Sequence, residues 1–249
     1  MQPAQPIIPV ADMRRAPDHR SERVSQVLYG HIVKQLEFRD TFALCESEDG
    51  YRGWIGSSYL VTADKPQSNL TVVTSNIAIL DDQTGNGRLV LPFGSLIASG
   101  GGDLFYAHDG AELILLFGRL DIIEDVPLNR IIAEGISLVS SPYLWGGCSS
   151  LGFDCSGFTQ TLYRRVGVNL PRDSKDQTLV GTEVTLEESV AGDLIFFPGH
   201  VAILLTDRKI LHASRLRGMV ALESLAPNHP KFRSDLAGAI TTVKRILES

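Results

Sequence analysis

The first half of the chain is a run of short strand-like segments separated by turns, and this pattern limits what it can form. Between residues 24 and 117, groups of β-branched and aromatic residues are interrupted by Gly30, by Asp49-Gly50 and by Gly53. Short strands joined by glycine-containing turns are typical of small barrels and sandwiches. Helical periodicity is absent here, so we expect an all-β fold.

The strand-like pattern also repeats. Residues 27–33 (VLYGHIV) resemble residues 91–97 (LPFGSLI), and Asp49-Gly50 recurs as Asp109-Gly110. Two copies of one small β unit would explain both similarities, and the alternative is a chance likeness between strand–turn sequences. Residues 62–69, which are polar around Pro66, are the expected linker between the two units.

The pattern changes after Pro127, where residues 128–139 carry apolar side chains at helical spacing. A proline suits the first turn of a helix. A glycine-rich loop, a second helix and several strands are expected to follow. This indicates an α+β domain that continues to the C-terminus.

Whole-chain properties exclude some classes of protein. The 249 residues allow two domains or three small ones, and the net charge of −6 does not favour nucleic acid or an anionic membrane as a partner. No segment approaches the roughly 18 apolar residues of a membrane helix, and the N-terminus does not resemble a secretory signal. Three cysteines cannot all pair with one another, which favours reduced thiols and a cytoplasmic location.

Cys155 is expected in the first turn of an amphipathic helix capped by Asp154. The helix has an apolar stripe that repeats every four residues and then a C-cap glycine: Phe158, Leu162, Val166 and Gly167. A helix N-terminus lowers the pKa of a thiol, and its amide groups can stabilise an oxyanion. The alternative is that Cys155 is only a small buried residue.

Two histidines supply the other half of a nucleophilic site. Residues 200–205 and 209–214 are expected to form a hairpin around a three-residue loop, with Leu205 opposite Lys209. His200 and His212 are then diagonal neighbours on one face, whereas a two-residue loop would place them on opposite faces. In this arrangement His200 accepts the proton of Cys155, and His212 orients His200.

Metal binding is the competing interpretation of the same residues. Cysteine and histidine are zinc ligands, but the separation between Cys148 and Cys155 is too long for a zinc knuckle. We therefore expect no metal and no other cofactor. Cys148 is expected to be a loop residue without a role, and Cys45 a core residue.

These residues resemble the NlpC/p60 family of cysteine peptidases, which cleave bacterial cell-wall peptides. The resemblance covers approximately residues 127–249 and rests on the motifs at 143–147, 153–157, 171–174, 192–194, 200–201 and 211–214. The N-terminal half resembles bacterial SH3 domains at residues 12–14, 19–22 and 49–54. The whole chain looks like the cytoplasmic subgroup that hydrolyses γ-D-glutamyl bonds in murein peptides.

The resemblance implies an α+β papain-like catalytic domain preceded by small all-β SH3-like barrel domains. The expected limits are 1–64 for a first SH3-like domain that caps the substrate cleft, 65–124 for a second one with a scaffold role, and 125–249 for the peptidase. We expect a monomer.

The resemblance also implies the site. Cys155 attacks the γ-D-Glu–diamino acid bond of a murein tri- or tetrapeptide, His200 acts as base and then acid, and His212 orients His200. By analogy, Tyr143 lies near the oxyanion or the substrate. The expected pocket residues are Asp154, Ser156 and Ser174.

An aromatic and an acidic residue of the first SH3-like domain, Tyr51 and Glu22, are expected to meet the free N-terminal ammonium of the substrate. Asp154 would otherwise raise the pKa of the neighbouring thiol, so we expect its side chain to point away from the thiol and to hold the ammonium group of the substrate. In the alternative interpretation, Asp154 is only an N-cap, Tyr51 only barrel core and Glu22 only a solvated charge.

Release of L-Ala-γ-D-Glu is the expected reaction. Two other functions stay open: an amidase or acyltransferase that uses the same thiol, and a non-catalytic module that binds cell-wall fragments. The sequence does not decide between diaminopimelate and lysine as the third residue of the peptide.

Overall fold

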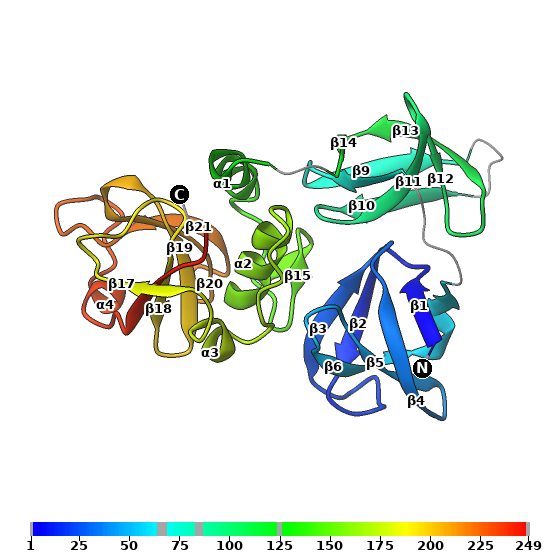
Figure 1. Cartoon of the computed structure of the whole chain (residues 1–249), viewed down its shortest axis with the longest axis horizontal. Helices are drawn as coiled ribbons and strands as arrows, with labels where there is room; N and C mark the ends of the chain where they lie inside the picture. The colour runs from blue at the N-terminus through cyan, green and yellow to red at the C-terminus, as the bar shows by residue number, and fades with distance from the viewer. Residues whose placement is uncertain (1, 64–68, 83–86, 124–125, 248–249) are drawn as a thin grey trace. The chain divides into compact units, whose positions relative to one another are not determined.

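The computed structural model describes residues 2–63, 69–82, 87–123 and 126–247 (Figure 1). The chain forms two compact units. Unit 1 consists of Met1–Asp125 and Trp145–Leu151, and unit 2 consists of Val126–Leu144 and Gly152–Ser249.

The first part of unit 1 is a seven-stranded antiparallel sheet with the order β3-β2-β6-β5-β4-β1-β7. Its core is formed by small and branched side chains that alternate with outward-facing ones, including the fully buried Ala11, Met13 and Ile55. The strands are β1 (Gln2–Pro6), β2 (Val10–Arg14), β3 (Arg23–Leu28), β4 (Val33–Arg39), β5 (Phe42–Glu46), β6 (Arg52–Gly56) and β7 (Leu60–Thr62).

A second seven-stranded sheet follows, with the order β10-β9-β13-β12-β11-β8-β14. The strands are β8 (Leu70–Val73), β9 (Ile77–Asp81), β10 (Arg88–Pro92), β11 (Leu96–Gly101), β12 (Leu104–Tyr106), β13 (Glu112–Phe117) and β14 (Leu120–Ile122). The two orders are the same when seven is added to each strand number of the first sheet, so β10 corresponds to β3 and β14 to β7. The predicted internal repeat is therefore confirmed.

The glycines that suggested the repeat have equivalent conformations. Gly30 and Gly94 have φ values of 81° and 86°, and Gly50 and Gly110 have φ values of 78° and 87°. This left-handed region favours glycine, so the turns required the residues that made the two copies recognisable.

Two details of the first half differ from expectation. β1 and β2 precede residue 24, where the sequence pattern placed the first strand; the three prolines of this region hide its extended character. The expected linker at 62–69 lies mostly outside the described residues, as does residue 125, where the peptidase domain was expected to begin.

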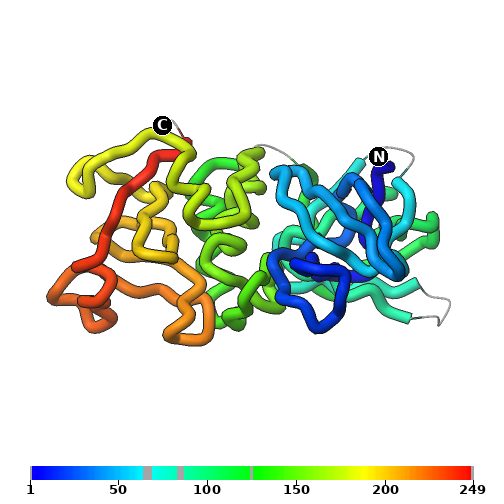
Figure 2. The backbone as a smooth tube through the Cα atoms, turned by 90° about the horizontal axis from the view of Figure 1, so that it is seen from below, coloured from blue at the N-terminus to red at the C-terminus, as the bar shows by residue number. Residues whose placement is uncertain are grey.

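Unit 2 contains a six-stranded antiparallel sheet with the order β17-β22-β18-β19-β20-β21. Figure 2 follows its backbone from the green helices to the red C-terminal strand. The strands of this sheet are β17 (Thr182–Val184), β18 (Leu194–Phe197), β19 (His200–Leu204), β20 (Lys209–Ser214), β21 (Met219–Ser224) and β22 (Thr242–Arg245). The other elements of unit 2 are α1 (Leu128–Ser137), β16 (Gly152–Phe153), α2 (Cys155–Arg164), α3 (Ser174–Gln177) and α4 (Ser234–Ala237).

Helix α2 packs against β19 and β20 and also contacts α1. Phe158 and Leu162, on the predicted apolar stripe, are fully buried. The helix ends at Arg164, so Val166 lies beyond it rather than on the stripe as expected. Gly167 adopts a φ of 74°, and its amide donates to the carbonyl of Arg164, which ends the helix with a turn. This packing holds the N-terminus of α2 beside the start of β19.

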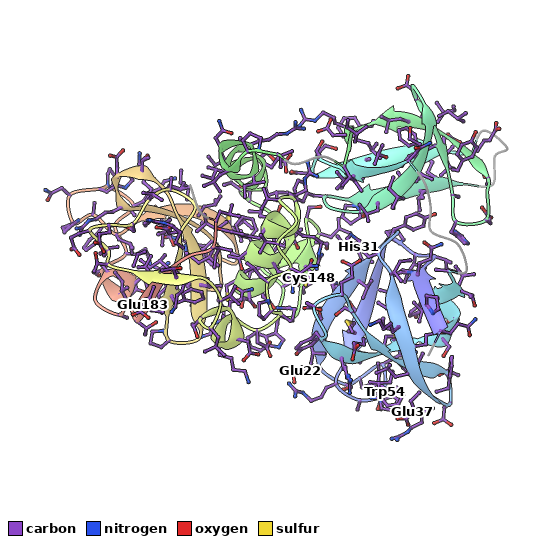
Figure 3. All side chains as sticks on the ribbon, viewed as in Figure 1. Glu22, His31, Glu37, Trp54, Cys148 and Glu183 are labelled. Atoms are coloured by element: carbon purple, nitrogen blue, oxygen red, sulfur yellow. The ribbon has the colours of Figure 1, made fainter. Side chains whose placement is uncertain are left out.

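The glycine-rich segment Trp145–Leu151 belongs to unit 1. It contains β15 (Cys148–Ser149), and Cys148 is labelled in Figure 3. The amide of Cys148 donates to the side chain of Gln26, and Ser150 accepts from the amide of Phe93. The segment is thus anchored on both sheets of unit 1.

No helix among the described residues is both long enough and apolar enough to cross a lipid bilayer.

Candidate active site

Asp154 is the N-cap of α2, as predicted. Its carboxylate accepts a hydrogen bond from the amide of Gly157 at 2.7 Å. Cys155 is the first residue of the helix and is 8% exposed. A thiol in this position faces the unpaired amide groups of the helix end.

Burial has the largest effect on the pKa of the Cys155 thiol. It raises the pKa of Cys155 to about 11, and the negative charge of Asp154 acts in the same direction. Hydrogen bonds from the amides of Val201 and Ser156 partly oppose this increase. The thiol is therefore protonated at neutral pH and needs a base before it can act as a nucleophile.

The hairpin brings the two histidines together with the predicted register. Ile203 lies opposite Leu211, and the amide of Leu205 donates to the carbonyl of Lys209, so a three-residue loop is confirmed. Two residues of this loop, Asp207 and Arg208, have positive φ values of 59° and 55°. The Nε2 atom of His200 is 2.7 Å from Nδ1 of His212.

The ring of Phe197 stacks on the ring of His200, with the ring centroids 5.8 Å apart. Burial lowers the pKa of His200 to about 3, with smaller contributions from His212 and Arg233. The imidazole is therefore neutral at neutral pH and able to accept a proton. The backbone amide of Val201 hydrogen-bonds to the thiol of Cys155. His200 precedes Val201 and is the first residue of β19, so it lies next to that thiol.

A buried glutamate, Glu223, binds the second histidine of this pair and was not identified from the sequence. Oε2 of Glu223 lies 2.8 Å from Nε2 of His212, and the side chain is 2% exposed. Two arginines bind the same carboxylate: Arg233 donates to Oε2 at 2.5 Å, and Arg217 donates to Oε1 at 2.9 Å. Burial alone would raise the pKa of Glu223, but the hydrogen bonds from His212, Arg217 and Arg233 lower it to about 2.

The ionised carboxylate determines which nitrogen atoms carry protons. It can only accept, so Nε2 of His212 donates to it, and Nδ1 of neutral His212 is then an acceptor. Nε2 of His200 must therefore donate to His212, which leaves the lone pair of His200 on Nδ1. Glu223 thus prepares His200 to accept a proton through Nδ1.

Glu223 left a weak signal in the sequence. It is an acidic residue that follows four apolar residues in β21. It lies opposite Ile210, which is two residues from His212 on the neighbouring strand. This diagonal placement on one face depends on the β20–β21 register. Without that register, Glu223 looks like an ordinary strand-end charge.

A second network surrounds the start of α2. Arg172, which is 3% exposed, donates to both carboxylate oxygens of Asp154, at 3.1 and 2.6 Å. It also donates to the hydroxyl of Ser156 at 2.9 Å. Arg172 belongs to a motif noted in the sequence, but no role was assigned to it.

The cationic group facing Asp154 in the structure is therefore Arg172 of the same chain. Its positive charge opposes the effect of Asp154 on the pKa of Cys155. The roles of Asp154 and Ser156 in substrate binding stay predictions. The network continues through Gln177, which is fully buried and donates to the carbonyl of Ser156 at 3.1 Å. Ser174 begins the same short helix, α3, and is partly buried.

Tyr143 lies close enough to Cys155 for the two groups to interact electrostatically. Burial raises the pKa of Tyr143 to about 12, and the charges of Cys155 and Asp154 contribute. Its phenol therefore stays protonated at neutral pH and can donate a hydrogen bond. The amide of Tyr143 donates to the carbonyl of Gly218 at 2.7 Å, which ties it to the β20–β21 turn.

The remaining two predicted residues lie in unit 1. Glu22, labelled in Figure 3, accepts hydrogen bonds from Trp145 at 2.8 Å and from Arg15 at 2.7 Å. Tyr51 is partly buried and packs against the core of the first sheet. Their contact with a substrate ammonium stays a prediction.

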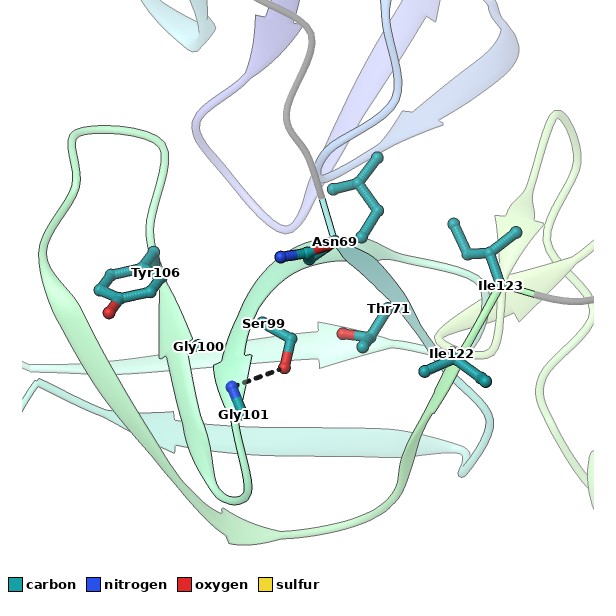
Figure 4. Close-up of a pocket in the computed structure, with 9 residues that line it drawn as sticks. Asn69, Thr71, Ser99, Gly100, Gly101, Tyr106, Ile122 and Ile123 are labelled. Atoms are coloured by element: carbon teal, nitrogen blue, oxygen red, sulfur yellow. Dashed lines mark hydrogen bonds between the residues drawn. The ribbon is translucent and has the colours of Figure 1, made fainter.

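Elsewhere among the described residues, we considered a metal site and a surface pocket as alternatives to the site around Cys155. No group of three or more His, Cys, Asp or Glu side chains in this part of the chain is arranged to hold a metal ion. A pocket in the second sheet, shown in Figure 4, includes Tyr106, Thr71 and Ser99 but no predicted site residue. Thr71 donates to the carbonyl of Ile97, and Ser99 accepts from the amide of Gly101.

Comparisons with known proteins agree with this architecture. Residues 140–237 match the NlpC/P60 family, and residues 13–60 match the bacterial dipeptidyl-peptidase Sh3 domain. A crystal structure of an NlpC/P60 family protein from Bacillus cereus ATCC 10987 superimposes with a TM-score of 0.86 over 99% of this chain and 100% of that chain, at 24% identity. The papain-like catalytic domain with SH3-like all-β domains before it is therefore confirmed.

Two curated relatives support the assignment. A γ-D-glutamyl-L-lysine dipeptidyl-peptidase of Bacillus cereus is 31% identical over 221 residues, which cover 78% of this chain and 65% of the relative. A probable endopeptidase NlpC of Escherichia coli is 38% identical over 113 residues, which cover 38% of this chain and 73% of the relative. The chain spans between 43% and 65% of the length of the dipeptidyl-peptidases that it matches. With a thiol at a helix N-terminus and a histidine pair beside it, the chain belongs to the NlpC/P60 family of cysteine peptidases.

Proposed function

We propose that this peptidase hydrolyses the γ-D-Glu–diamino acid bond of murein peptides with a free N-terminal L-Ala and releases L-Ala-γ-D-Glu. The row of Cys155, His200 and His212 carries the proposal, since it combines a nucleophile, a base and a group that orients the base. The Bacillus cereus relative, a γ-D-glutamyl-L-lysine dipeptidyl-peptidase, supports the choice of bond.

The reaction begins with proton transfer. Nδ1 of His200 takes the proton of the Cys155 thiol as the sulfur attacks the γ-carbonyl carbon of D-Glu. The oxyanion that forms is stabilised by amide groups at the start of α2, with the phenol of Tyr143 as a further donor. His200 then gives its proton to the departing nitrogen of the diamino acid, which leaves as a free amine.

The second half of the reaction removes the acyl group. Water attacks the thioester while His200 accepts one of its protons. The thioester C–S bond breaks, the thiol is regenerated with the proton held by His200, and the dipeptide leaves with a new γ-carboxylate on D-Glu.

We also propose that the substrate is a murein fragment released for recycling and that the protein acts in the cytoplasm. The three cysteines support this location, because Cys45, Cys148 and Cys155 are all thiols rather than disulfides.

The test is incubation with L-Ala-γ-D-Glu-diaminopimelate and analysis of the products by mass spectrometry, with Cys155→Ala as the inactive control. We expect the parent protein to release L-Ala-γ-D-Glu and the variant to release nothing. Acetylation of the alanine amine is expected to reduce cleavage strongly.

Two other outcomes would contradict the proposal. Release of a different fragment, or transfer of the acyl group to an added amine, would identify an amidase or an acyltransferase. Binding of the tripeptide with equal affinity by both proteins, without turnover in either, would indicate a binding module.

A further inference from the structure

One cation beside the catalytic residues has no assigned role. Arg215 directly follows β20 and begins the turn between β20 and β21, whose ends are joined by the pairing of Ser214 with Met219. The turn is tied to the site on two sides. Gly218 accepts the hydrogen bond from the amide of Tyr143, and Arg217 donates to Glu223.

Arg215 differs from the other arginines around the site. Arg172 is paired with Asp154, and both Arg217 and Arg233 are paired with Glu223. Arg215 is exposed and forms no hydrogen bond or ion pair within the part of the chain that the structure describes. An arginine with no internal partner has its full set of donors available to a ligand.

The charge of Arg215 reaches the catalytic groups. Burial is the main cause of the lowered pKa of His200, and Arg215 contributes in the same direction. Arg215 also opposes the increase that burial causes in the pKa of Tyr143. Arg215 also follows His212 by three residues, and its turn is hydrogen-bonded to Tyr143 through Gly218, so Arg215 lies near the position where the scissile bond must be placed.

The chemistry of cleavage indicates which part of the substrate is near Arg215. His200 protonates the departing nitrogen, so groups beside His200 surround the diamino acid rather than the L-Ala end. The carbon that bears this nitrogen also bears the α-carboxylate of the diamino acid. A guanidinium group matches a carboxylate in geometry and charge.

We propose that Arg215 is a specificity-determining residue that binds a carboxylate of the diamino acid released by cleavage. This inference rests on the proposed function. The carboxylate has two possible sources: the α-carboxylate, which lysine and diaminopimelate share, and the second carboxylate, which only diaminopimelate has.

Three peptides separate these sources: L-Ala-γ-D-Glu followed by diaminopimelate, by L-lysine, or by L-lysine carboxamide. The value of kcat/KM is measured for the parent, for Arg215→Gln and for the control Arg208→Gln. Arg208 is an exposed arginine just before the other end of β20, and its side chain is 52% exposed.

Each source predicts its own pattern. If Arg215 binds the α-carboxylate, the parent cleaves the lysine peptide roughly five- to tenfold better than its carboxamide, and Arg215→Gln removes the difference. If it binds the second carboxylate, the parent prefers the diaminopimelate peptide by a similar factor, and Arg215→Gln removes that preference. Arg208→Gln keeps the parent's ratios in both cases.

Equal ratios among the three peptides in the parent and in Arg215→Gln would overturn the role of Arg215 and leave the proposed function intact. Failure of the parent to cleave any of the three would overturn both.

Discussion

Proton positions at the site depend on Glu223, a carboxylate that is separated from the proposed nucleophile Cys155 by His212 and His200. Glu223 is ionised because Arg217 and Arg233 bind it, and it fixes the tautomer of His212 and, through it, that of His200. A buried ionised group of this kind needs its partners, since an unpaired charge would be strongly unfavourable. The two arginines therefore support the proposed catalytic geometry through their hydrogen bonds to Glu223.

Glu223→Gln tests this positioning role. A glutamine has only one oxygen, so it cannot accept from His212 and from both arginines in the same geometry, and its amide can favour the wrong tautomer of His212. We expect kcat to fall on the order of 100-fold with little change in KM, because His200 loses part of its contribution as a general base. Steady-state kinetics on the murein tripeptide provides the measurement.

The matched control is Glu183→Gln. Glu183, labelled in Figure 3, has a side chain that is 68% exposed and pairs with Lys244. It is expected to keep the parent's kcat. If Glu223→Gln raised KM by as large a factor as it lowered kcat, or left kcat unchanged, the result would argue against control of the His200 tautomer by Glu223.

The pKa of His200 predicts the acid side of the pH profile. A pKa lowered to about 3 keeps the imidazole neutral, and thus able to accept a proton, well below the ordinary value of 6.5. We expect kcat/KM to stay nearly constant from pH 7 to pH 5. An acid limb centred near pH 6.5 would show that His200 titrates as an exposed histidine does.

Among the elements, α2 has the largest influence on the site. Its N-terminus presents Cys155, and its buried face contacts β19 and β20, which carry the two histidines. The position of the helix is further set by an ion pair between Glu134 of α1 and Arg165, which follows α2. Their atoms are 3.0 Å apart, and both side chains are at most 5% exposed.

Glu134→Ala is therefore expected to destabilise unit 2. Removing one partner leaves Arg165 buried without its carboxylate, which typically costs about 3–5 kcal/mol of the free energy of unfolding. Urea denaturation followed by circular dichroism measures the change. The exposed pair gives the comparison: Glu183→Ala should cost less than about 1 kcal/mol. Similar losses for both variants would mean that burial of the Glu134–Arg165 pair has little importance.

At the scale of the whole molecule, the buried titrating groups predict loss of stability in acid. The pKa of His200 is lowered, so below pH 6.5 the unfolded chain binds a proton that the folded chain does not. The pKa of Glu223 is also lowered, so its stabilisation is present above pH 4.5 and is lost as the pH falls toward 2. Both groups therefore act in the same direction.

We expect the free energy of unfolding to fall between pH 6.5 and 4.5 by up to about 1.4 kcal/mol per pH unit for the proton of His200. His200→Asn should remove much of this slope. Urea denaturation at pH 7.0, 5.5 and 4.5 provides the test, and a constant stability over this range would contradict the burial of a neutral His200.

The two sheets of unit 1 illustrate how much a sequence reveals when local chemistry decides the structure. Gly30 and Gly94, and likewise Gly50 and Gly110, are required by turns with positive φ, so the repeat was visible before the strand order was known. The prolines around β1 had the opposite effect, because extended edge segments with proline do not resemble strands.

The sequence by itself determined the features that depend on nearby residues: the repeat, the capped helix that begins at Cys155, and a hairpin loop of the length that places His200 and His212 on one face. Only the tertiary structure decided the partners that come from distant segments. Glu223 joins His212 through the β20–β21 register, and Arg172 joins Asp154 through the packing of α3 near α2. Short-range spacing is fixed by backbone geometry, whereas the pairing of buried charges depends on how whole elements pack, which no local pattern contains.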